Sequence, residues 1–282
     1  MVTVVDKPVI QHVVEEAVAA GMTKIVLVTR SGKEAIENHF DSNFELETQL
    51  QQKGKVTLLH AIHEIIPHNI ELISIRQSRA AGLGDAIRCA APVVGNEPFA
   101  VMLPDVLFST PDDARWNMKT MIDAFSQSGH AQILVEKVPE TLVDQYGIID
   151  CGLRTLDIGA SAQVHGMVEK PSIETAPSNL SIVGRYVLPP SIFALLKMTG
   201  KGAGGEIQLT DALLKLLAQS SMQALMMRGR SFDCGNKLGF LQANLMLGLQ
   251  DKSVGAELMS ILQQTLTGYL NEPKAVTRRE VA

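Results

Sequence analysis

The first 138 residues alternate between strand-like and helix-like patterns of apolar side chains. After Pro8, apolar residues recur at helical spacing until Gly21, and Lys24–Thr29 (KIVLVT) is typical of a strand buried on both faces. Further strands are expected at 70–75, 99–103 and 133–135, and further helices at 31–40, 44–52, 84–91 and 117–128. This alternation predicts an α/β fold with a Rossmann-like, mostly parallel sheet and helices on both faces.

The pattern changes after Pro139. Shorter runs at 146–151, 164–170 and 181–187 predict a smaller mixed β region, followed by helices at 191–196, 209–219, 238–249 and 257–270. The apolar face of the last helix suits packing or a subunit contact, so a homo-oligomer is expected. With no repeat or low-complexity linker, residues 1–282 are expected to form a single domain. Its parts are 1–138, 139–237, the C-terminal helices 238–270 and a polar tail at 271–282.

Composition narrows the class of protein. The 282 residues are 46% hydrophobic and 20% charged, with a formal net charge of −5, as in ordinary globular proteins. A general nucleic-acid binder more often carries a basic face, so no nucleic acid is expected as a partner. No apolar stretch is long enough to span a bilayer, the first residues do not resemble a signal peptide, and three cysteines form no CxxC pair. A cytoplasmic protein with no membrane partner is therefore expected.

Two isolated carboxylates are the sharpest chemical signal. Asp105 directly follows the apolar run 99–103, and ligands of open α/β sheets bind beyond the carboxyl ends of strands. Asp233 lies far downstream, in the sequence FDCGNK. A Mg²⁺ ion uses one or two protein carboxylates together with substrate phosphates, which fits two separated acids. The alternative is that Pro104–Asp105 only forms a turn.

Two other segments carry polar groups at the ends of expected strands. Glu169 can accept hydrogen bonds from sugar hydroxyls, and Lys170 offers a point charge for a phosphate, although the pair could equally be a surface ion pair. Gln77 suits the edge of a pyrimidine, and Gly82 and Gly84 allow close approach of the backbone at the start of a helix. Cys234, which has no assigned base, is more simply a buried small side chain.

Taken in order, these segments resemble the bacterial UTP–glucose-1-phosphate uridylyltransferases, in the nucleotide-sugar pyrophosphorylase superfamily. The resemblance runs from Val5 to about Gly248. It is carried by VDKPVIQHVVEEAVAAG, IENHFDSNFELE, GLGDAIRCAAPVVG, LPDV, QYGIID, VEKP, APSNLSIVGRYVL, GGEIQLTDA and DCGNKLGF. It implies the nucleotide-diphospho-sugar transferase fold, with 1–138 as the nucleotide-binding half and 139–237 as the sugar-phosphate-binding half.

The resemblance also implies roles for individual residues. Gln77 and Gly82 would hold the uracil, while Gly147 and Glu169 would contact the glucose and Gly184 would close the sugar pocket. Lys170 would bind the phosphate of glucose 1-phosphate. Asp105 would bind Mg²⁺, and Asp233 would be the second acid on the metal side.

The implied reaction is Mg²⁺-dependent attack of a glucose 1-phosphate oxygen on the α-phosphate of UTP, which gives UDP-glucose and pyrophosphate. No covalent enzyme intermediate is needed, so catalysis would consist of positioning and charge neutralisation, with Asp105 and Lys170 as the catalytic residues.

The chain departs from this family at its start and at two loop positions. Relatives begin with a strand and a Gly-rich loop ahead of the segment that matches Val4–Pro8, so the first strand is expected to be missing here. Ser78 stands where relatives carry Gly, and Asp85 where they carry His. A shortened, impaired enzyme is one explanation, with turnover restored when the segment is added. A non-catalytic sugar-nucleotide-binding paralogue or regulatory subunit is the alternative, and a changed nucleotide or sugar substrate is a third.

Overall fold

The computed structural model describes residues 1–110, 115–153 and 155–271. The elements of the first half are β1 (Thr3–Val4), β2 (Lys7–Pro8), α1 (Val9–Ala19), β3 (Lys24–Thr29), α2 (Glu34–Phe40), α3 (Phe44–Gln52), α4 (Val56–His63), β4 (Glu71–Arg76), α5 (Leu83–Val94), β5 (Phe99–Met102), β6 (Val106–Ser109), α6 (Trp116–Ser128) and β7 (Ala131–Lys137). The expected order of strands and helices is confirmed here. Helix α5 continues past its expected end and includes Pro92.

The second half begins with a short 3₁₀ turn, η1 (Glu140–Gln145). It is followed by β8 (Gly147–Asp150), β9 (Ser161–Gln163), β10 (Gly166–Glu169), β11 (Leu180–Leu188), α7 (Ile192–Lys197), η2 (Ala203–Gly205), α8 (Leu209–Leu217), β12 (Met222–Met226), β13 (Arg230–Asp233), α9 (Lys237–Gln250) and α10 (Gly255–Asn271). Most of the expected polar tail lies outside the described residues.

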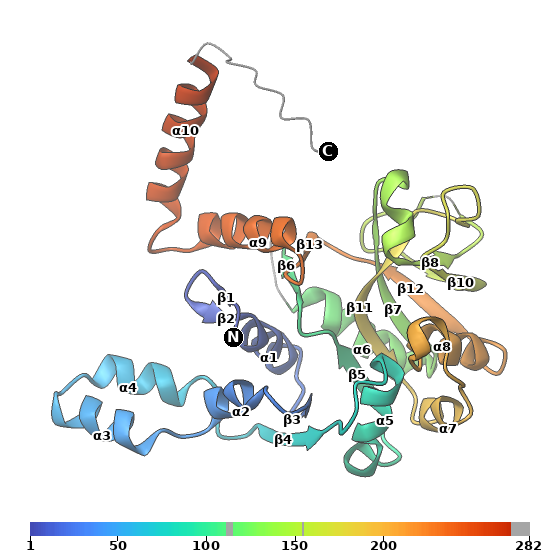
Figure 1. The fold of residues 1–282 in the computed structure, drawn as a ribbon, viewed down its shortest axis with the longest axis horizontal. Helices are drawn as coiled ribbons and strands as arrows, with labels where there is room; N and C mark the ends of the chain where they lie inside the picture. The colour runs from blue at the N-terminus through green and yellow to red at the C-terminus, as the bar shows by residue number, and fades with distance from the viewer. Residues whose placement is uncertain (111–114, 154, 272–282) are drawn as a thin grey trace.

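A seven-stranded mixed sheet organises the described chain (Figure 1). Six of its strands follow the order β10-β8-β11-β7-β12-β9. The seventh, β5, lies off this path and pairs with β11. The β7–β12 ladder is parallel, but the long strand β11 runs antiparallel to β5, β7 and β8. For that reason the described sheet has fewer parallel ladders than the alternating pattern predicted.

Three small sheets accompany the large one. They are the hairpin β1–β2, the antiparallel pair β6–β13 and the parallel pair β3–β4. Among the described strands, β3 pairs only with β4 and β5 pairs only with β11. Each of these two strands therefore keeps one edge without a described partner strand.

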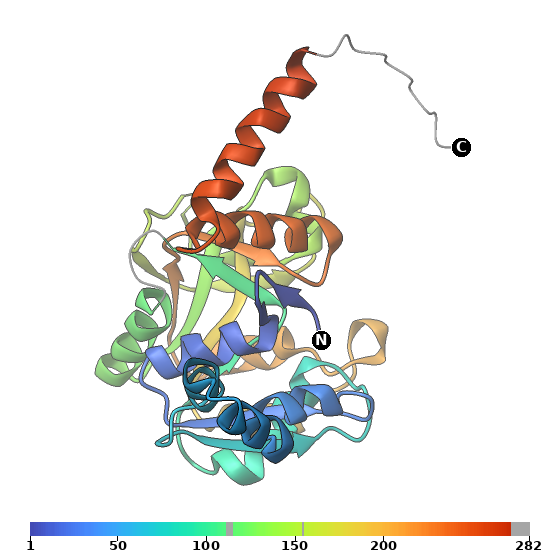
Figure 2. The same ribbon diagram turned by 90° about the vertical axis from the view of Figure 1, so that its left-hand side faces the viewer.

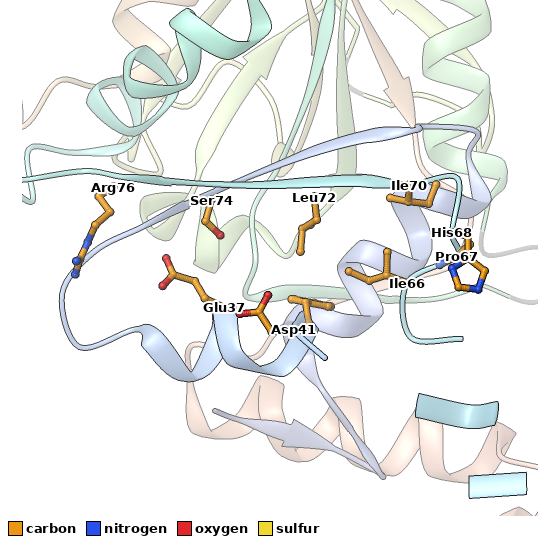
Figure 3. Close-up of a pocket in the computed structure, with 10 residues that line it drawn as sticks. Glu37, Asp41, Ile66, Pro67, His68, Ile70, Leu72, Ser74 and Arg76 are labelled. Carbon is orange, nitrogen blue, oxygen red and sulfur yellow. The ribbon is translucent and has the colours of Figure 1, made fainter. Parts of the chain in front are cut away.

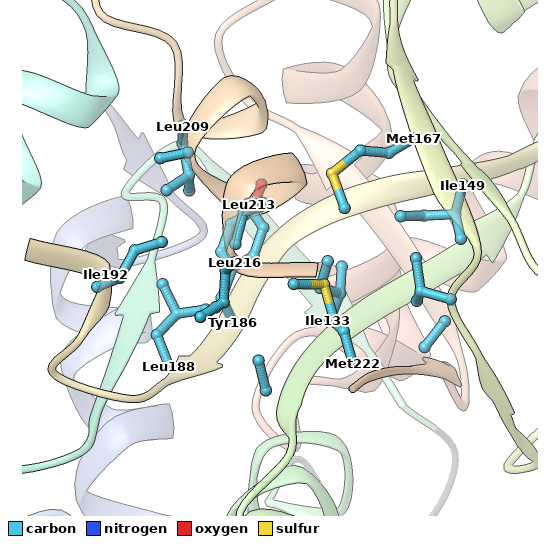
Figure 4. Packing of buried hydrophobic residues seen from close by; sticks show 14 of the residues in the cluster. Ile133, Ile149, Met167, Tyr186, Leu188, Ile192, Leu209, Leu213, Leu216 and Met222 are labelled. Carbon is cyan, nitrogen blue, oxygen red and sulfur yellow. The ribbon is translucent and has the colours of Figure 1, made fainter. Parts of the chain in front are cut away.

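Both faces of the large sheet are covered by helices, as predicted. On one face Ile133 and Tyr186 pack against Ile192 of α7 and Leu213 of α8 (Figure 4). On the other face Leu134 packs against Met118 and Met121 of α6. Consecutive residues of β7 thus enter opposite clusters, which is the alternation expected of a strand inside a two-sided core.

Two parts of the chain project from this core. Helices α2, α3 and α4 contain no buried residue, and α3 and α4 lie at one end of the molecule in Figure 1. Helix α10 extends away from the body, as Figures 1 and 2 show, and exposes Met259, Ile261, Leu266 and Tyr269. Within the part of the chain that the structure describes, no helix is both long and apolar enough to cross a membrane.

Candidate active site

Asp105 lies in the tight connection between β5 and β6. The Leu103 N–H donates to the carbonyl oxygen of Gly184 at 3.0 Å, and the Cys234 N–H donates to the carbonyl oxygen of Asp105 at 2.7 Å. Strand β6 pairs with β13 so that Val106 stands opposite Asp233. This pairing joins segments more than 120 residues apart and carries Asp233 to the neighbourhood of Asp105.

The two carboxylates approach the same point beside Gly235. A Cβ atom placed on Gly235 would lie 2.9 Å from Asp233 Oδ1 and 3.3 Å from Asp105 Oδ2. Asp233 is oriented by the Gly235 N–H, which donates to its Oδ1 at 2.8 Å, and by Asn236 Nδ2, which donates to its Oδ2 at 3.0 Å. Asn236 also caps α9 by accepting the Gly239 N–H at 2.7 Å. The N-terminus of a helix therefore lies close to the acid pair, where its dipole favours negative charge.

The electrostatics of Asp105 reflect this crowding. Partial burial raises the pKa of Asp105 above its usual range, and the negative charge of Asp233 raises it further. A backbone hydrogen bond and the Arg185 guanidinium act in the opposite direction on the same pKa. Two carboxylates that destabilise each other's charged form are a favourable pair of ligands for a cation.

The donor set suits a hard divalent ion. Mg²⁺ is commonly bound by one or two protein carboxylates when substrate phosphates supply other ligands. Among the described residues no group of three or more His, Cys, Asp or Glu side chains is arranged to hold a metal. A bridging site shared with phosphates therefore fits Asp105 and Asp233 better than a closed protein cage.

A buried cation, which the sequence analysis did not identify, supports the Asp105 turn. Arg185 of β11 is 0% exposed and forms an ion pair with Glu16 of α1 at 2.8 Å. Its Nη1 donates to the carbonyl oxygen of Leu103 at 3.0 Å and its Nη2 to that of Val106 at 2.8 Å. Arg185 thus holds the backbone on both sides of Asp105. The available signal was a charged residue inside the apolar run 180–188.

The backbone conformation at residue 184 requires glycine. Its φ is +75°, and an added Cβ would lie 2.7 Å from Leu103 Cδ1. The β7–β11 register shifts between Ile182 and Tyr186, so Gly184 sits in an irregular part of β11. The structure brings Gly184 next to the residue that begins the Asp105 turn, and its contact with a sugar stays a prediction.

Gly147 and Glu169 are cross-strand neighbours on β8 and β10. A Cβ on Gly147 would lie 3.1 Å from Glu169 Oε2, so the glycine leaves room for that carboxylate. The hydroxyl of Thr210, in the first turn of α8, donates to Glu169 Oε2 at 3.0 Å. Thr210 is a second site residue that the sequence analysis missed, because nothing local predicts its contact with residue 169.

Lys170 adopts a left-handed backbone conformation with φ +48°. Such a conformation costs a non-glycine residue about 1–3 kcal/mol and is found most often at functional sites. The Lys170 N–H donates to the carbonyl oxygen of Tyr146 at 3.0 Å. Burial raises the pKa of Tyr146, and the charges of Asp233 and Glu136 raise it further. Tyr146 thus holds the backbone of the Lys170 turn and lies within the electrostatic influence of Asp233.

The Gln77–Gly84 segment forms a separate wall beyond the end of β4. Gln77 lines a cavity of about 520 Å³ together with Arg30, Ser31, Arg76, Ser78 and Ala80. Gly82 has φ +96°, and a Cβ there would lie 2.8 Å from the carbonyl oxygen of Ile207. The Ile207 N–H donates to Ala81 O at 2.8 Å, and the Gly84 N–H donates to Ile207 O at 2.9 Å. Because Ile207 and Thr210 belong to the same short segment, residues 206–210 connect this wall to Glu169.

A larger cavity of about 740 Å³ lies between α2 and β4 (Figure 3). Its wall includes Leu72 and Ser74 of β4 and Glu37 of α2, and it shares Arg76 with the Gln77 cavity. None of the residues that the sequence analysis selected lines it. The candidate site is therefore assigned to the acid pair and its neighbours.

Cys234 is buried, as the sequence analysis predicted. Burial raises the pKa of its thiol to about 11, and the charges of Asp233 and Asp105 contribute in the same direction. At neutral pH the side chain is therefore a thiol, which is a poor nucleophile.

Comparison with known proteins places the chain in a family. Residues 1–248 match the model of the nucleotidyl transferase family. The chain is 49% identical over 265 residues to a UTP–glucose-1-phosphate uridylyltransferase of Haemophilus influenzae, covering 93% of this chain and 90% of the relative. It is 47% identical over 268 residues to one of Escherichia coli K12, covering 94% and 88%.

Solved structures agree with these relatives. A UDP-glucose pyrophosphorylase from Acinetobacter baumannii is 48% identical and superimposes with a TM-score of 0.87, covering 94% of this chain and 90% of that one. A UTP-bound UGPase structure from the same species gives the same values.

Proposed function

Since this chain belongs to the nucleotidyl transferase family, in the branch of the UTP–glucose-1-phosphate uridylyltransferases, we propose that it transfers UMP from UTP to glucose 1-phosphate. The products are UDP-glucose and pyrophosphate. The observation that supports this most directly is the approach of the Asp105 and Asp233 carboxylates to the same point beside Gly235.

The acid pair would hold the divalent ion, for which we propose Mg²⁺. Its carboxylate oxygens are hard ligands, and their mutual repulsion falls when a cation lies between them. When bound, the ion would supply positive charge for phosphate oxygens. Arg185 keeps the Asp105 turn in place, and the hydrogen bonds from Gly235 and Asn236 keep Asp233 in place.

The chain's own residues position the two substrates. Lys170 would bind the phosphate of glucose 1-phosphate and offset the repulsion between it and the triphosphate. Glu169, beside Gly147, would accept hydrogen bonds from glucose hydroxyls, and Thr210 orients that carboxylate. In this scheme the attacking phosphate oxygen needs no general base, because it is already ionised at neutral pH.

The nucleotide would lie against the Gln77–Gly84 wall. Gln77 and Gly82 would hold the uracil, and Arg30 and Arg76, which line the same cavity, provide positive charge near the triphosphate. Residues 1–138 would then act as the nucleotide-binding half and 139–237 as the sugar-phosphate-binding half.

A coupled assay for pyrophosphate tests the proposal directly. The 282-residue chain is supplied with UTP, Mg²⁺ and glucose 1-phosphate, and the expected result is release of pyrophosphate together with UDP-glucose in equal amounts. Omitting glucose 1-phosphate is the control, since hydrolysis of UTP would release pyrophosphate without a sugar nucleotide. Tight binding of UDP-glucose with no turnover under any condition would favour the non-catalytic sugar-nucleotide-binding paralogue instead.

We also propose that the protein is a homo-oligomer in the cytoplasm. The apolar side chains that α10 exposes suit a contact between subunits, and the cysteines that the structure describes are all free. Light scattering coupled to gel filtration measures the mass in solution, and a monomer at micromolar concentration would contradict the first part.

A further inference from the structure

Asp85 is a charged residue that contacts Gln77, to which the proposed function gives the uracil base. It lies in the first turn of α5 and is only 6% exposed. Gln77 Nε2 donates to Asp85 Oδ2 at 2.8 Å and to the carbonyl oxygen of Gly82 at 3.3 Å. Arg88 donates to the other carboxylate oxygen, Asp85 Oδ1.

These contacts determine which way the Gln77 amide faces. A carboxylate and a carbonyl oxygen are both acceptors only, so the NH₂ group of Gln77 must be the part that faces them. A reversed amide would place three oxygen atoms together with no hydrogen between them. Both hydrogens of the NH₂ group are then in use, and the atom that remains for a ligand is Oε1, an acceptor.

An acceptor at this point discriminates between pyrimidines. The Watson–Crick edge of uracil has a single donor, N3–H, whereas N3 of cytosine is an acceptor. Oε1 of Gln77 can therefore accept from uracil N3–H, but it would face an unpaired acceptor on cytosine. Such a pairing loses the hydrogen bond and leaves an acceptor facing an acceptor, which is penalised to the extent that the base excludes water from both.

We infer that Asp85 is a specificity-determining residue, which selects uridine nucleotides over cytidine nucleotides by fixing the orientation of the Gln77 amide. Asp85 touches no substrate in this scheme and acts through Gln77 alone. Arg88 in turn holds Asp85 and compensates its charge, so the carboxylate lies near a triphosphate site without standing as an isolated negative charge. The inference rests on the proposed function, because it assumes that the base lies against Gln77.

The test is the ratio of UTP to CTP affinity, measured by calorimetry in the presence of Mg²⁺. Asp85→Asn keeps the size of the side chain but gives it both a donor and an acceptor, so Gln77 can turn either way. The expected result is a preference for UTP in the unchanged chain that falls about tenfold in Asp85→Asn, the size of one hydrogen bond. Loss of packing alone would weaken both nucleotides equally and leave the ratio unchanged.

A matched control removes one negative charge elsewhere. Asp123→Asn acts on an exposed residue of α6 that pairs with Lys119, and it should leave the ratio unchanged. A preference for UTP that survives in Asp85→Asn would overturn the inference while leaving the proposed function intact. Failure of the unchanged chain to bind any uridine nucleotide would overturn both, and the pyrophosphate assay would record that second failure separately. Thermal melting of each variant verifies that it is folded.

Discussion

The acid pair and the Gln77–Gly84 wall, which we call the nucleotide loop after its proposed role, are built in different ways. Asp105 and Asp233 lie between strands whose backbone is held by a fully buried arginine, by the β6–β13 ladder and by a capped helix. The nucleotide loop follows β4, a strand paired only with β3 among the described strands and without a buried residue. Helices α2, α3 and α4, which precede β4 in the chain, also lack buried residues.

The contrast indicates a division of labour. Elements with few buried contacts open at lower free energy than the core, so the nucleotide side can adjust while the carboxylates stay fixed. A site that neutralises charge needs ligands at constant positions. A site that recognises a base can tolerate a wall that closes around the bound base. The predictions below measure how far this difference extends.

Replacing Arg185 should give the largest loss of stability. Arg185→Leu leaves the carboxylate of Glu16 buried without its partner, and removing one member of a buried pair costs about 3–5 kcal/mol. Urea unfolding measures the change in the free energy of unfolding. The double variant with Glu16→Leu should recover part of this loss. Equal destabilisation of the single and double variants would contradict the claim that the unpaired carboxylate of Glu16 causes the loss.

Asp105→Asn should lower turnover by about 10²–10³-fold, the range typical for removing one preorganised electrostatic contact. Affinity for glucose 1-phosphate should change far less, because the side chain is assigned to the metal and not to the sugar. Initial rates over a range of Mg²⁺ concentrations provide the measurement. An unchanged Mg²⁺ dependence would remove Asp105 from the metal site.

Gly184→Ala should destabilise the protein by about 1–3 kcal/mol, since it combines a positive φ with a clash against Leu103. Gly200→Ala is the matched control, because nothing lies within 4 Å of a Cβ placed there. Chemical denaturation of both variants should separate them clearly. Similar free energies of unfolding for the two variants would mean that the irregular part of β11 can shift to accommodate the added methyl group.

The raised pKa of Asp105 predicts a pH-dependent difference in stability without metal. A carboxyl whose folded-state pKa lies above its unfolded value is destabilising when ionised, so the penalty is present at neutral pH and absent in acid. The melting temperature of Asp105→Asn should therefore exceed that of the unchanged chain at pH 7. The gap should close as the pH falls through the raised pKa, and a constant gap at every pH would contradict this account.

Leu58→Ala, in helix α4, should have the smallest effect. The side chain is 51% exposed, and substitutions at such positions usually change stability by about 0.5 kcal/mol or less. Leu134→Ala in β7 is the comparison, with an expected cost of about 2–5 kcal/mol for a side chain that is 0% exposed. A large effect at Leu58 would mean that α4 packs against another surface in solution.

The sequence predicted those features that local pattern controls. Alternating apolar runs predicted the strands and helices, and the position of Asp105 after a strand predicted its place at a sheet edge. The resemblance to a family supplied the roles of Gln77, Gly147 and Glu169, and it identified the family correctly.

Long-range pairing explains what the sequence analysis could not predict. Asp233 was expected on the metal side together with Asp105, but the β6–β13 ladder that brings them together was not predicted. The contact of Thr210 with Glu169 likewise depends on how α8 packs. Asp85 appeared only as a departure from the family, because its hydrogen bond to Gln77 requires the turn between β4 and α5. The antiparallel direction of β11 was likewise not predicted, because an apolar run is compatible with a parallel or an antiparallel strand.

The left-handed turn at Lys170 limits what can replace this lysine. Glycine or asparagine would fit that backbone more comfortably, yet neither carries an ammonium group. The backbone conformation at residue 170 thus favours glycine or asparagine, whereas the proposed binding of an anionic phosphate ester favours lysine. Substitutions that relax the loop should be recovered from screens for heat tolerance and be lost from screens for sugar-nucleotide synthesis.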